Sequence, residues 1–361
     1  MVHPSLCPRG TGLSSSSQGR DRVGVEAALT QPAVRGKRIL SGIQPTGAPH
    51  IGNYFGAIRQ YVDLHHENDG FYFVANYHAL TTVRDAETMT RQSLDVALDL
   101  LACGLDPARA TVFLQSDIPE VMELTWILTC VTPMGLLERC HAYKDKVSQG
   151  LPADHGLFAY PVLMAADILA YDSDYVPVGQ DQKQHLEVTR DIATRLNYAF
   201  GQEILKLPEP YIMPQVATVP GLDGRKMSKS YGNDIGIFED DASVKRKIMR
   251  VVTDSTPVED PKDPSTCNAF QLFALFATEE ERAEMERRYR EGGVGYGEVK
   301  KQTIELFHRL LDPLRERRRA LERDPDFVRD VLRQGAKRAR GHAAEVLERA
   351  RTASGDRKSV V

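Results

Sequence analysis

The sequence has no apolar run long enough to cross a lipid bilayer, so a membrane span is not expected. Its five cysteines are scattered, form no CxxC pair and, Cys140–His141 apart, have no histidine nearby at metal-binding spacing. A zinc site is therefore not expected, and a reducing cytoplasm fits the chain better than secretion. No internal repeat is visible.

The charge shows no strong excess of either sign. The net charge of −4 excludes a polycation that binds nucleic acid with its whole surface. Any contact with nucleic acid must come from a local basic surface. The chain is 361 residues long, 42% hydrophobic and 27% charged, which is typical of a globular protein with a large core. This length predicts two domains.

The first 36 residues are rich in Ser, Gly, Arg and Pro and lack hydrophobic periodicity. We expect residues 1–36 to form a disordered N-terminal extension. Arg and Ser would also suit an organelle transit peptide, but Asp21 and Glu26 argue against that interpretation.

From residue 37 to about 235 the pattern alternates between short apolar runs and amphipathic stretches. This alternation predicts an α/β fold, a Rossmann-like doubly wound parallel sheet with helices on both faces. The predicted strands are Arg38–Gly42, Phe71–Ala75, Thr111–Leu114 and Asp174–Val178, and one of the clearest helices covers Ala86–Cys103.

After about residue 240 the strand patterns cease and charged amphipathic helices follow. We expect residues 236–352 to form a C-terminal all-helical domain, whose last helices can return to the first domain, and 353–361 to form a flexible tail. Residues 311–351 contain twelve Lys or Arg and eight Asp or Glu. Solvated helix faces explain this charge, and so does a weakly basic surface for RNA phosphates.

The stretch Pro45–Asn53 lies between a predicted strand and a predicted helix. Backbone N–H groups and the positive end of a helix dipole gather at such a turn, which suits a phosphate. His50 and Asn53 add side-chain donors. Gly52 has no Cβ, so a base or ribose can lie close to the backbone there.

A second informative stretch is Gly224–Ser230, which contains two lysines three positions apart in a glycine-flanked loop. Lysine carries a compact charge on a flexible stem, so Lys226 and Lys229 suit a mobile clamp on a polyphosphate. A Lys/Ser loop alone is weak support, because exposed loops often have this composition.

Three residues of a predicted helix, Tyr160, Met164 and Asp167, share one face. They present an aromatic ring, a thioether and a carboxylate, which matches the large apolar body and single N–H donor of an indole. An ordinary amphipathic helix with Asp167 facing water also explains the spacing, and spacing alone favours it.

Together, His50–Asn53 and Lys226–Ser230 resemble the HIGH and KMSKS elements of class I aminoacyl-tRNA synthetases. The second element matches letter for letter, whereas Asn53 replaces the final His of the first. The region from about 38 to 351 is similar to the bacterial-type tryptophanyl-tRNA synthetase family. Five further segments carry the likeness: Ser41–Gly47, His78–Thr81, Glu138–Lys146, Val252–Ser255 and Gly292–Gly297.

The resemblance implies a tryptophan pocket. In it, Asp167 accepts the indole N–H, and Gln44 and Gln182 hold the ammonium and carboxylate groups. The implied walls are Tyr160, Met164, Ile168, Val176 and Val178, with Gly42 beneath the ring. Leu40 departs from the family pattern, which often has Phe there. The related tyrosyl enzymes typically have a glutamine at the position of Met164, so Met164 favours indole over phenol.

The resemblance also implies an ATP site. Its catalytic residues are His50, Asn53, Lys146, Lys226 and Lys229. Its other ATP contacts are Gln44, Pro45, Thr46, Gly52, Gly179, Gln180, Asp181, Val219, Met227, Ser228 and Ser230. No protein metal site is implied, and Mg²⁺ is expected as a cofactor that bridges the phosphate oxygens.

The implied reaction is the formation of tryptophanyl-adenylate and pyrophosphate, followed by transfer to the 3′ end of tRNA(Trp). The implied protein is a cytoplasmic homodimer with tRNA lying across both subunits. Three alternatives stay open: a tyrosyl enzyme, a small-metabolite nucleotidyltransferase and a non-catalytic regulatory paralogue. Their common test is ATP–pyrophosphate exchange.

Overall fold

The computed structural model describes residues 34–140, 143–144, 148, 154–179, 183–212 and 219–355. Four of the predicted site residues, Lys146, Gln180, Asp181 and Gln182, lie outside these ranges, as does most of the predicted N-terminal extension. The described residues belong to one compact unit, which covers Ala33–Val361.

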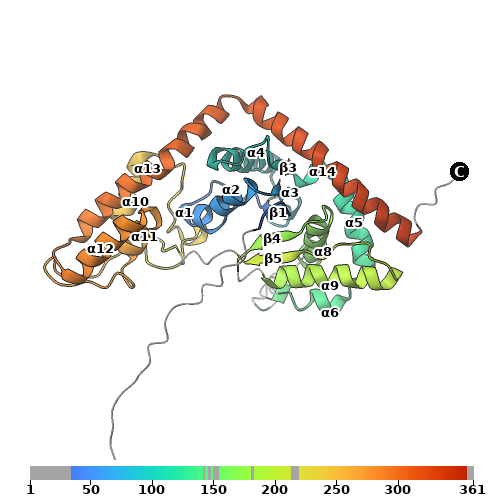
Figure 1. Ribbon diagram of the computed structural model, residues 1–361, viewed down its shortest axis with the longest axis horizontal. Helices are drawn as coiled ribbons and strands as arrows, with labels where there is room; N and C mark the ends of the chain where they lie inside the picture. The colour runs from blue at the N-terminus through green and yellow to red at the C-terminus, as the bar shows by residue number, and fades with distance from the viewer. Residues whose placement is uncertain are drawn as a thin grey trace, which may run out of the picture. The chain divides into compact units, whose positions relative to one another are not determined.

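At the centre is a five-stranded sheet in the order β3-β2-β1-β4-β5, in which every neighbouring pair is parallel (Figure 1). The strands are β1 (Arg38–Ile43), β2 (Asp69–Val74), β3 (Thr111–Leu114), β4 (Tyr175–Val178) and β5 (Glu209–Ile212). The predicted Rossmann-like sheet is confirmed, and the bounds of the four predicted strands agree within two residues. The sequence patterns did not reveal β5, because Glu209 and Pro210 interrupt its apolar pattern. Proline is tolerated there because β5 is an edge strand.

Side chains alternate across the sheet and feed two separate cores. Tyr72 and Val74 pack on the face covered by α2 (Arg59–His65) and α4 (Ala86–Cys103). Phe71 and Phe73 pack on the opposite face. The helices of that face are α5 (Pro119–Val131), α8 (His155–Leu169) and α9 (Lys183–Phe200), and Figure 1 shows α8 and α9 across the sheet from α4.

The region after the sheet is helical, as predicted. Its helices are α10 (Asp241–Met249), α11 (Asn268–Phe276), α12 (Glu279–Glu291), α13 (Tyr296–Glu322) and α14 (Pro325–Ser354). The last helix, α14, returns to the sheet and packs along β3. It reaches Ser354, so residue 353, where the predicted tail begins, is still helical. The predicted domain boundaries at 235 and 352 stay predictions.

Gly335 is the point of closest approach between α14 and the sheet. A Cβ at this position would overlap the backbone carbonyl oxygen of Val112 on β3. The same helix contains Gly341, where a Cβ would meet nothing within 4 Å.

We expect Gly335→Ala to destabilise the protein by about 1–3 kcal/mol, because overpacking forces α14 away from β3. Gly341→Ala is the matched control and should stabilise by about 0.5–1 kcal/mol, because alanine is the better helix former. Equilibrium urea unfolding of both variants measures the difference. Equal stabilisation by both substitutions would contradict the close packing.

Within the described ranges, no helix is both long and apolar enough to span a membrane.

Candidate active site

The candidate site lies where β1 and β4 are neighbours at the centre of the sheet. In open α/β sheets, ligands bind at the carboxyl ends of the strands where the strand order reverses. The chain leaving β1 enters Gln44–Asn53, and the chain leaving β4 reaches Gly179. The turn that contains Pro45–Asn53 and the predicted ATP contact Gly179 therefore follow strands that end at the same edge of the sheet.

A pocket of about 440 Å³ opens at this edge, a size that suits a small molecule. It collects every tryptophan-site residue predicted within the described ranges. These are Gly42, Gln44, Tyr160, Met164, Asp167, Ile168, Val176 and Val178. Leu40 also lines the pocket, together with Phe73, which was not predicted.

Gly42 and Phe73 fit together within this wall. A Cβ on Gly42 would overlap the ring of Phe73, so only glycine at this position of β1 lets the ring lie against the strand. Leu40 and Phe73 thus line the same pocket, and Phe73 supplies an aromatic ring from the neighbouring strand, β2.

Asp167 is 2% exposed, which contradicts the interpretation of an amphipathic helix with this residue facing water. Its Oδ2 lies 2.8 Å from His78 Nε2, and the Gln115 side-chain amide donates to Oδ1 at 2.9 Å and Oδ2 at 2.8 Å. Burial raises the pKa of Asp167, while the bonds from His78 and Gln115 lower it.

His78 and Gln115 are functional candidates that the sequence reasoning did not assign. His78 begins a segment noted only for its likeness to the family. Gln115 directly follows β3, and a polar residue at the carboxyl end of a strand is a signal that was available. A carboxylate has about four lone-pair positions. The three contacts therefore leave Asp167 with room for one further donor from the pocket.

The turn after β1 is held by a reciprocal cap. His50 is the N-cap of α1 (Ile51–Asn53): its Nδ1 accepts the Asn53 amide at 3.3 Å, and Asn53 Oδ1 accepts the His50 amide at 3.1 Å. An Nδ1 that accepts places the ring proton on Nε2. The groups able to donate to a phosphate are then His50 Nε2–H and the Asn53 side-chain N–H groups.

The structure leaves fewer free backbone N–H groups at this turn than the sequence predicts. The amide of Ile51 donates to Ile235 O at 2.9 Å, and those of Asn53 and Tyr54 donate to His50 O. Burial lowers the pKa of His50; the charge of Asp234 raises it and that of Lys229 lowers it. At neutral pH His50 is therefore an uncharged donor. A Cβ on Gly52 would come within 2.9 Å of the His50 ring, so glycine keeps this ring in place.

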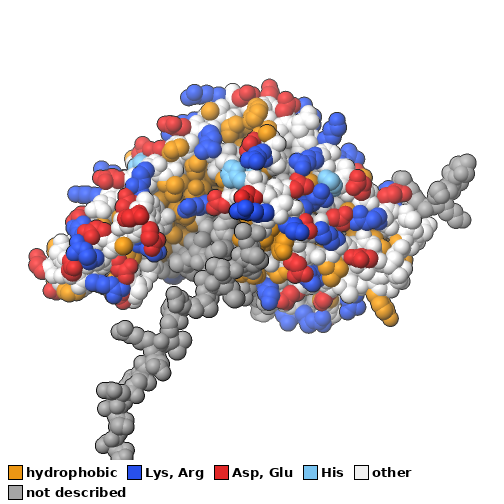
Figure 2. All heavy atoms as spheres, viewed as in Figure 1, with side chains coloured by type: hydrophobic (Ala, Val, Ile, Leu, Met, Phe, Trp, Pro, Cys, Tyr) orange, Lys and Arg blue, Asp and Glu red, His pale blue; other side chains and the backbone are white. Residues whose placement is uncertain are grey.

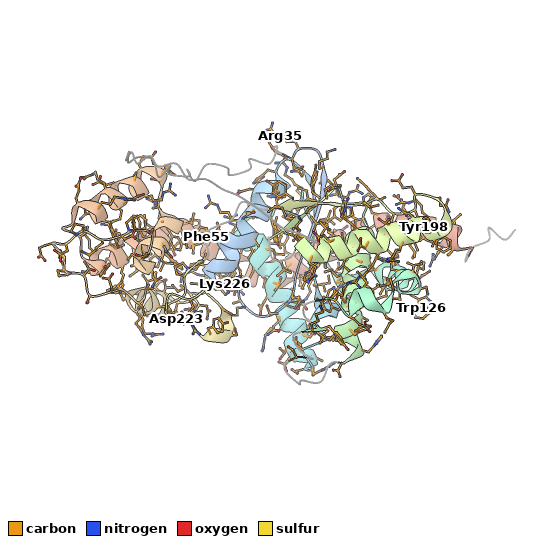
Figure 3. All side chains as sticks on the ribbon, turned by 90° about the horizontal axis from the view of Figure 1, so that it is seen from below. Arg35, Phe55, Trp126, Tyr198, Asp223 and Lys226 are labelled. Atoms are coloured by element: carbon orange, nitrogen blue, oxygen red, sulfur yellow. The ribbon has the colours of Figure 1, made fainter. Side chains whose placement is uncertain are left out.

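The lysine loop reaches this turn through Lys229, whose ammonium donates to Thr46 O at 3.1 Å. The loop is anchored by Met227, which is buried and whose amide donates to Val219 O at 2.9 Å. The side chain of Lys226 is exposed and is labelled in Figure 3. The loop thus places one lysine on the turn and presents the other to solvent.

A second cavity, of about 110 Å³, lies between this turn, α4 and the lysine loop. It is lined by four of the predicted ATP residues, namely Gln44, Thr46, Asn53 and Lys229. Pro45, Val219, Met227, Ser228 and Ser230 do not line it, and Gly179 lies at the end of β4.

Residues 34–312 match the family described as tRNA synthetases class I (W and Y). The chain is 58% identical over 314 residues to a tryptophan–tRNA ligase of Rhodopirellula baltica, covering 87% of this chain and 98% of that protein. It is 52% identical over 315 residues to the tryptophan–tRNA ligase of Fusobacterium nucleatum, covering 87% and 97%.

The fold is similar to that of the crystal structure of tryptophanyl-tRNA synthetase from Campylobacter jejuni complexed with ADP and tryptophan. The TM-score is 0.82 at 49% sequence identity, and the match covers 88% of this chain and 99% of that one. The chain therefore belongs to the class I tRNA synthetases of the tryptophan and tyrosine family.

Proposed function

We propose that this protein is a tryptophan–tRNA ligase. It activates L-tryptophan with ATP to give tryptophanyl-adenylate and pyrophosphate, and then transfers tryptophan to the 3′ end of tRNA(Trp). The observation that carries this proposal is Asp167, a buried acceptor in an apolar pocket beside the turn that meets the lysine loop. Relatives at 58% and 52% identity bear the same function in their names.

The chemistry of the pocket supports tryptophan as the amino acid. An indole offers one N–H donor on a large apolar body, and Asp167 has room for one more donor. Met164 and Ile168 supply apolar contact on the same helix, α8. A phenol hydroxyl would instead need a polar partner where Met164 stands. Gln44, and Gln182 outside the described residues, hold the ammonium and carboxylate groups.

The activation step needs no general base, because the attacking tryptophan carboxylate is already an anion. Its oxygen forms a bond to the α-phosphorus of ATP while the bond to pyrophosphate breaks in line. Catalysis then depends on positioning and on donors that meet the growing phosphate charge. These donors are His50 Nε2–H, the side-chain N–H groups of Asn53, Lys226, Lys229 and, outside the described residues, Lys146.

Mg²⁺ fits this site as an ion bound to the phosphates of ATP rather than to side chains of the protein. The donors at the turn and the loop are imidazole, amide and ammonium groups, which suit phosphate oxygens rather than a hard cation. When bound, Mg²⁺ neutralises charge on the phosphates of ATP, and the residues of the chain orient those phosphates.

We propose a homodimer whose interface includes the outer face of α5. Met122, Trp126 and Cys130 lie four positions apart on this helix and are exposed, Trp126 at 69%. Met134, just beyond α5, is exposed at 63%. Exposed apolar groups of this size, close together, are typical of a protein interface. Figure 3 shows where Trp126 lies relative to Lys226.

Trp126→Ser should shift the protein toward monomer by at least tenfold in the dimer dissociation constant, because a central Trp contributes strongly to an interface. Tyr198→Ser is the matched control, since Tyr198 is exposed at 88% and lies on α9, away from the outer face of α5. Sedimentation equilibrium of both variants measures the shift. An unchanged dimer, or a monomeric native protein, would contradict this interface.

We propose that residues 236–352 form the domain that binds tRNA. Residues 37–235 form the proposed catalytic domain. Several arginines of α14 are paired within the helix, such as Arg329 with Asp326 at 2.8 Å and Arg333 with Asp330 at 2.5 Å. Figure 2 shows the two signs of charge interleaved over the face it displays. Phosphates would therefore compete with these carboxylates for the arginines. Binding of tRNA releases counterions from its phosphates, so we expect it to weaken as the salt concentration rises. We place the enzyme in the cytoplasm, where its tRNA is used.

ATP–pyrophosphate exchange with purified protein tests the function. We expect exchange with tryptophan, and none with tyrosine or without an amino acid. Exchange with tyrosine would indicate a tyrosyl enzyme. Exchange without an amino acid would indicate a different nucleotidyl transfer, and no exchange at all would favour a regulatory paralogue.

A further inference from the structure

Asp99 is a buried carboxylate that the proposed mechanism does not use. It lies on α4 and is 2% exposed. Its Oδ1 accepts a hydrogen bond from Arg318 Nε on α13 at 2.6 Å. Its other oxygen, Oδ2, is also buried and has no hydrogen-bond partner among the described residues. Unpaired buried acceptors are rare because they lose solvation without compensation.

Asp99 also lines a cavity at the proposed ATP site. Asp99 lines the 110 Å³ cavity together with Lys229, Thr46 and Asn53, all of them at the proposed ATP site. The ammonium of Lys229 is held by Thr46 O at 3.1 Å. A cavity of this size, with polar groups on its wall, has room for water.

Charge connects the two groups as well. Burial raises the pKa of Asp99 to about 6, while Arg318 and Lys229 lower it. Burial lowers the pKa of Lys229, and the charges of Asp234 and, to a smaller extent, Asp99 raise it. An ion pair with Arg318 that only joins α4 to α13 explains Oδ1, but it explains neither the unpaired Oδ2 nor the cavity that Asp99 shares with Lys229.

We propose that Asp99 is a positioning residue that draws Lys229 toward Thr46 before ATP binds. The negative charge of Asp99 attracts the ammonium toward the cavity, and the triphosphate must compete with this attraction when the loop closes on it. Asp99 therefore weakens the binding of ground-state ATP. Lys229 then binds the phosphates most strongly in the transition state. This inference rests on the proposed role of Lys229 as a phosphate clamp.

The contact of Arg318 ties this device to the helical region. The guanidinium of Arg318 lies over the ring of Phe238 at 5.0 Å, and the neighbouring Ile237 amide donates to Pro49 O at 3.2 Å in the turn after β1. A displacement of α13 would thus alter the partner of Asp99 next to the ATP site.

The test measures the equilibrium affinity for α,β-methylene-ATP, which cannot be cleaved by activation, and the exchange kinetics beside it. Asp99→Asn keeps the shape and removes the charge, so we expect its Kd to fall at least threefold, without any increase in kcat. Asp99→Ala is the second variant and should change the Kd in the same direction. Thermal melting establishes that each variant is folded.

Asp95→Asn is the matched control. Asp95 lies one turn earlier on α4 and contacts the same arginine, Arg318, at 3.5 Å, but it does not line the cavity. Its Kd should stay within a factor of about 1.5 of that of the native protein. In a Lys229→Met background, Asp99→Asn should no longer change the Kd, because the charge acts through Lys229.

An unchanged or raised Kd in folded Asp99→Asn would overturn the inference, and so would the same threefold fall in the Lys229→Met background. If the native protein catalyses exchange and these results fail, the positioning role is wrong and the proposed function stands. If the native protein neither binds the analogue nor catalyses exchange, the proposed function is wrong and the positioning role falls with it.

Discussion

Asp167→Ala is expected to raise the KM for tryptophan by about 10- to 150-fold, with little change in the affinity for ATP. A hydrogen bond to a buried charged group contributes about 1.5–3 kcal/mol, which corresponds to this range. The substitution also leaves His78 and Gln115 without their common acceptor, which adds to the loss. Exchange kinetics at varied tryptophan and at varied ATP separate the two effects.

Asp154→Ala is the matched control for this prediction. Asp154 precedes the same helix, α8, and its carboxylate pairs with Arg84 at 3.2 Å with both side chains exposed. Exposed ion pairs contribute little, so this variant should behave as the native protein does. A native KM for tryptophan in Asp167→Ala would mean that the carboxylate does not recognise the indole.

Lys229→Ala is expected to lower the rate of activation by about 10²- to 10³-fold, the usual cost of removing one donor to a developing charge. The KM for ATP should change much less, because the lysine loop grips the transition state more strongly than bound ATP. Single-turnover formation of the adenylate measures the rate directly. Lys229→Arg should recover only part of it, since a planar guanidinium does not replace a compact ammonium.

Lys245→Ala provides the control, because Lys245 is an exposed lysine on α10. Its activation rate should equal that of the native protein. A Lys229→Ala variant with native rate and a raised KM would show that the loop only binds ATP in the ground state.

The fold could be predicted wherever a local pattern was sufficient. The runs that form β1, β2 and β3 are short and apolar, and β4 is bounded by Gly179, so their residues alone predict strands. The edge strand β5 carries Glu209 and Pro210 and shows no such pattern. The packing of α14 on β3 depends on Gly335 meeting Val112, a contact across 223 positions (335 − 112) that no local pattern contains.

The site divides in the same way. Tyr160, Met164 and Asp167 line one pocket because they share one face of α8, but their spacing alone favoured a helix with Asp167 facing water. The partners of Asp167 were not predicted, since His78 and Gln115 lie 89 and 52 positions away in the chain. The resemblance to the family supplied the roles of the residues, and the structure supplied the neighbours that hold Asp167 and Lys229 in place.

An analogue of tryptophan with sulfur in place of the indole N–H, β-(3-benzothienyl)alanine, tests the recognition of indole by Asp167 most directly. The native protein should use tryptophan at least about 100-fold better in kcat/KM, because a site built to hydrogen-bond a donor rejects an analogue without one. Asp167→Ala should lose most of this preference. Equal use of tryptophan and the analogue by the native protein would contradict the assignment of Asp167.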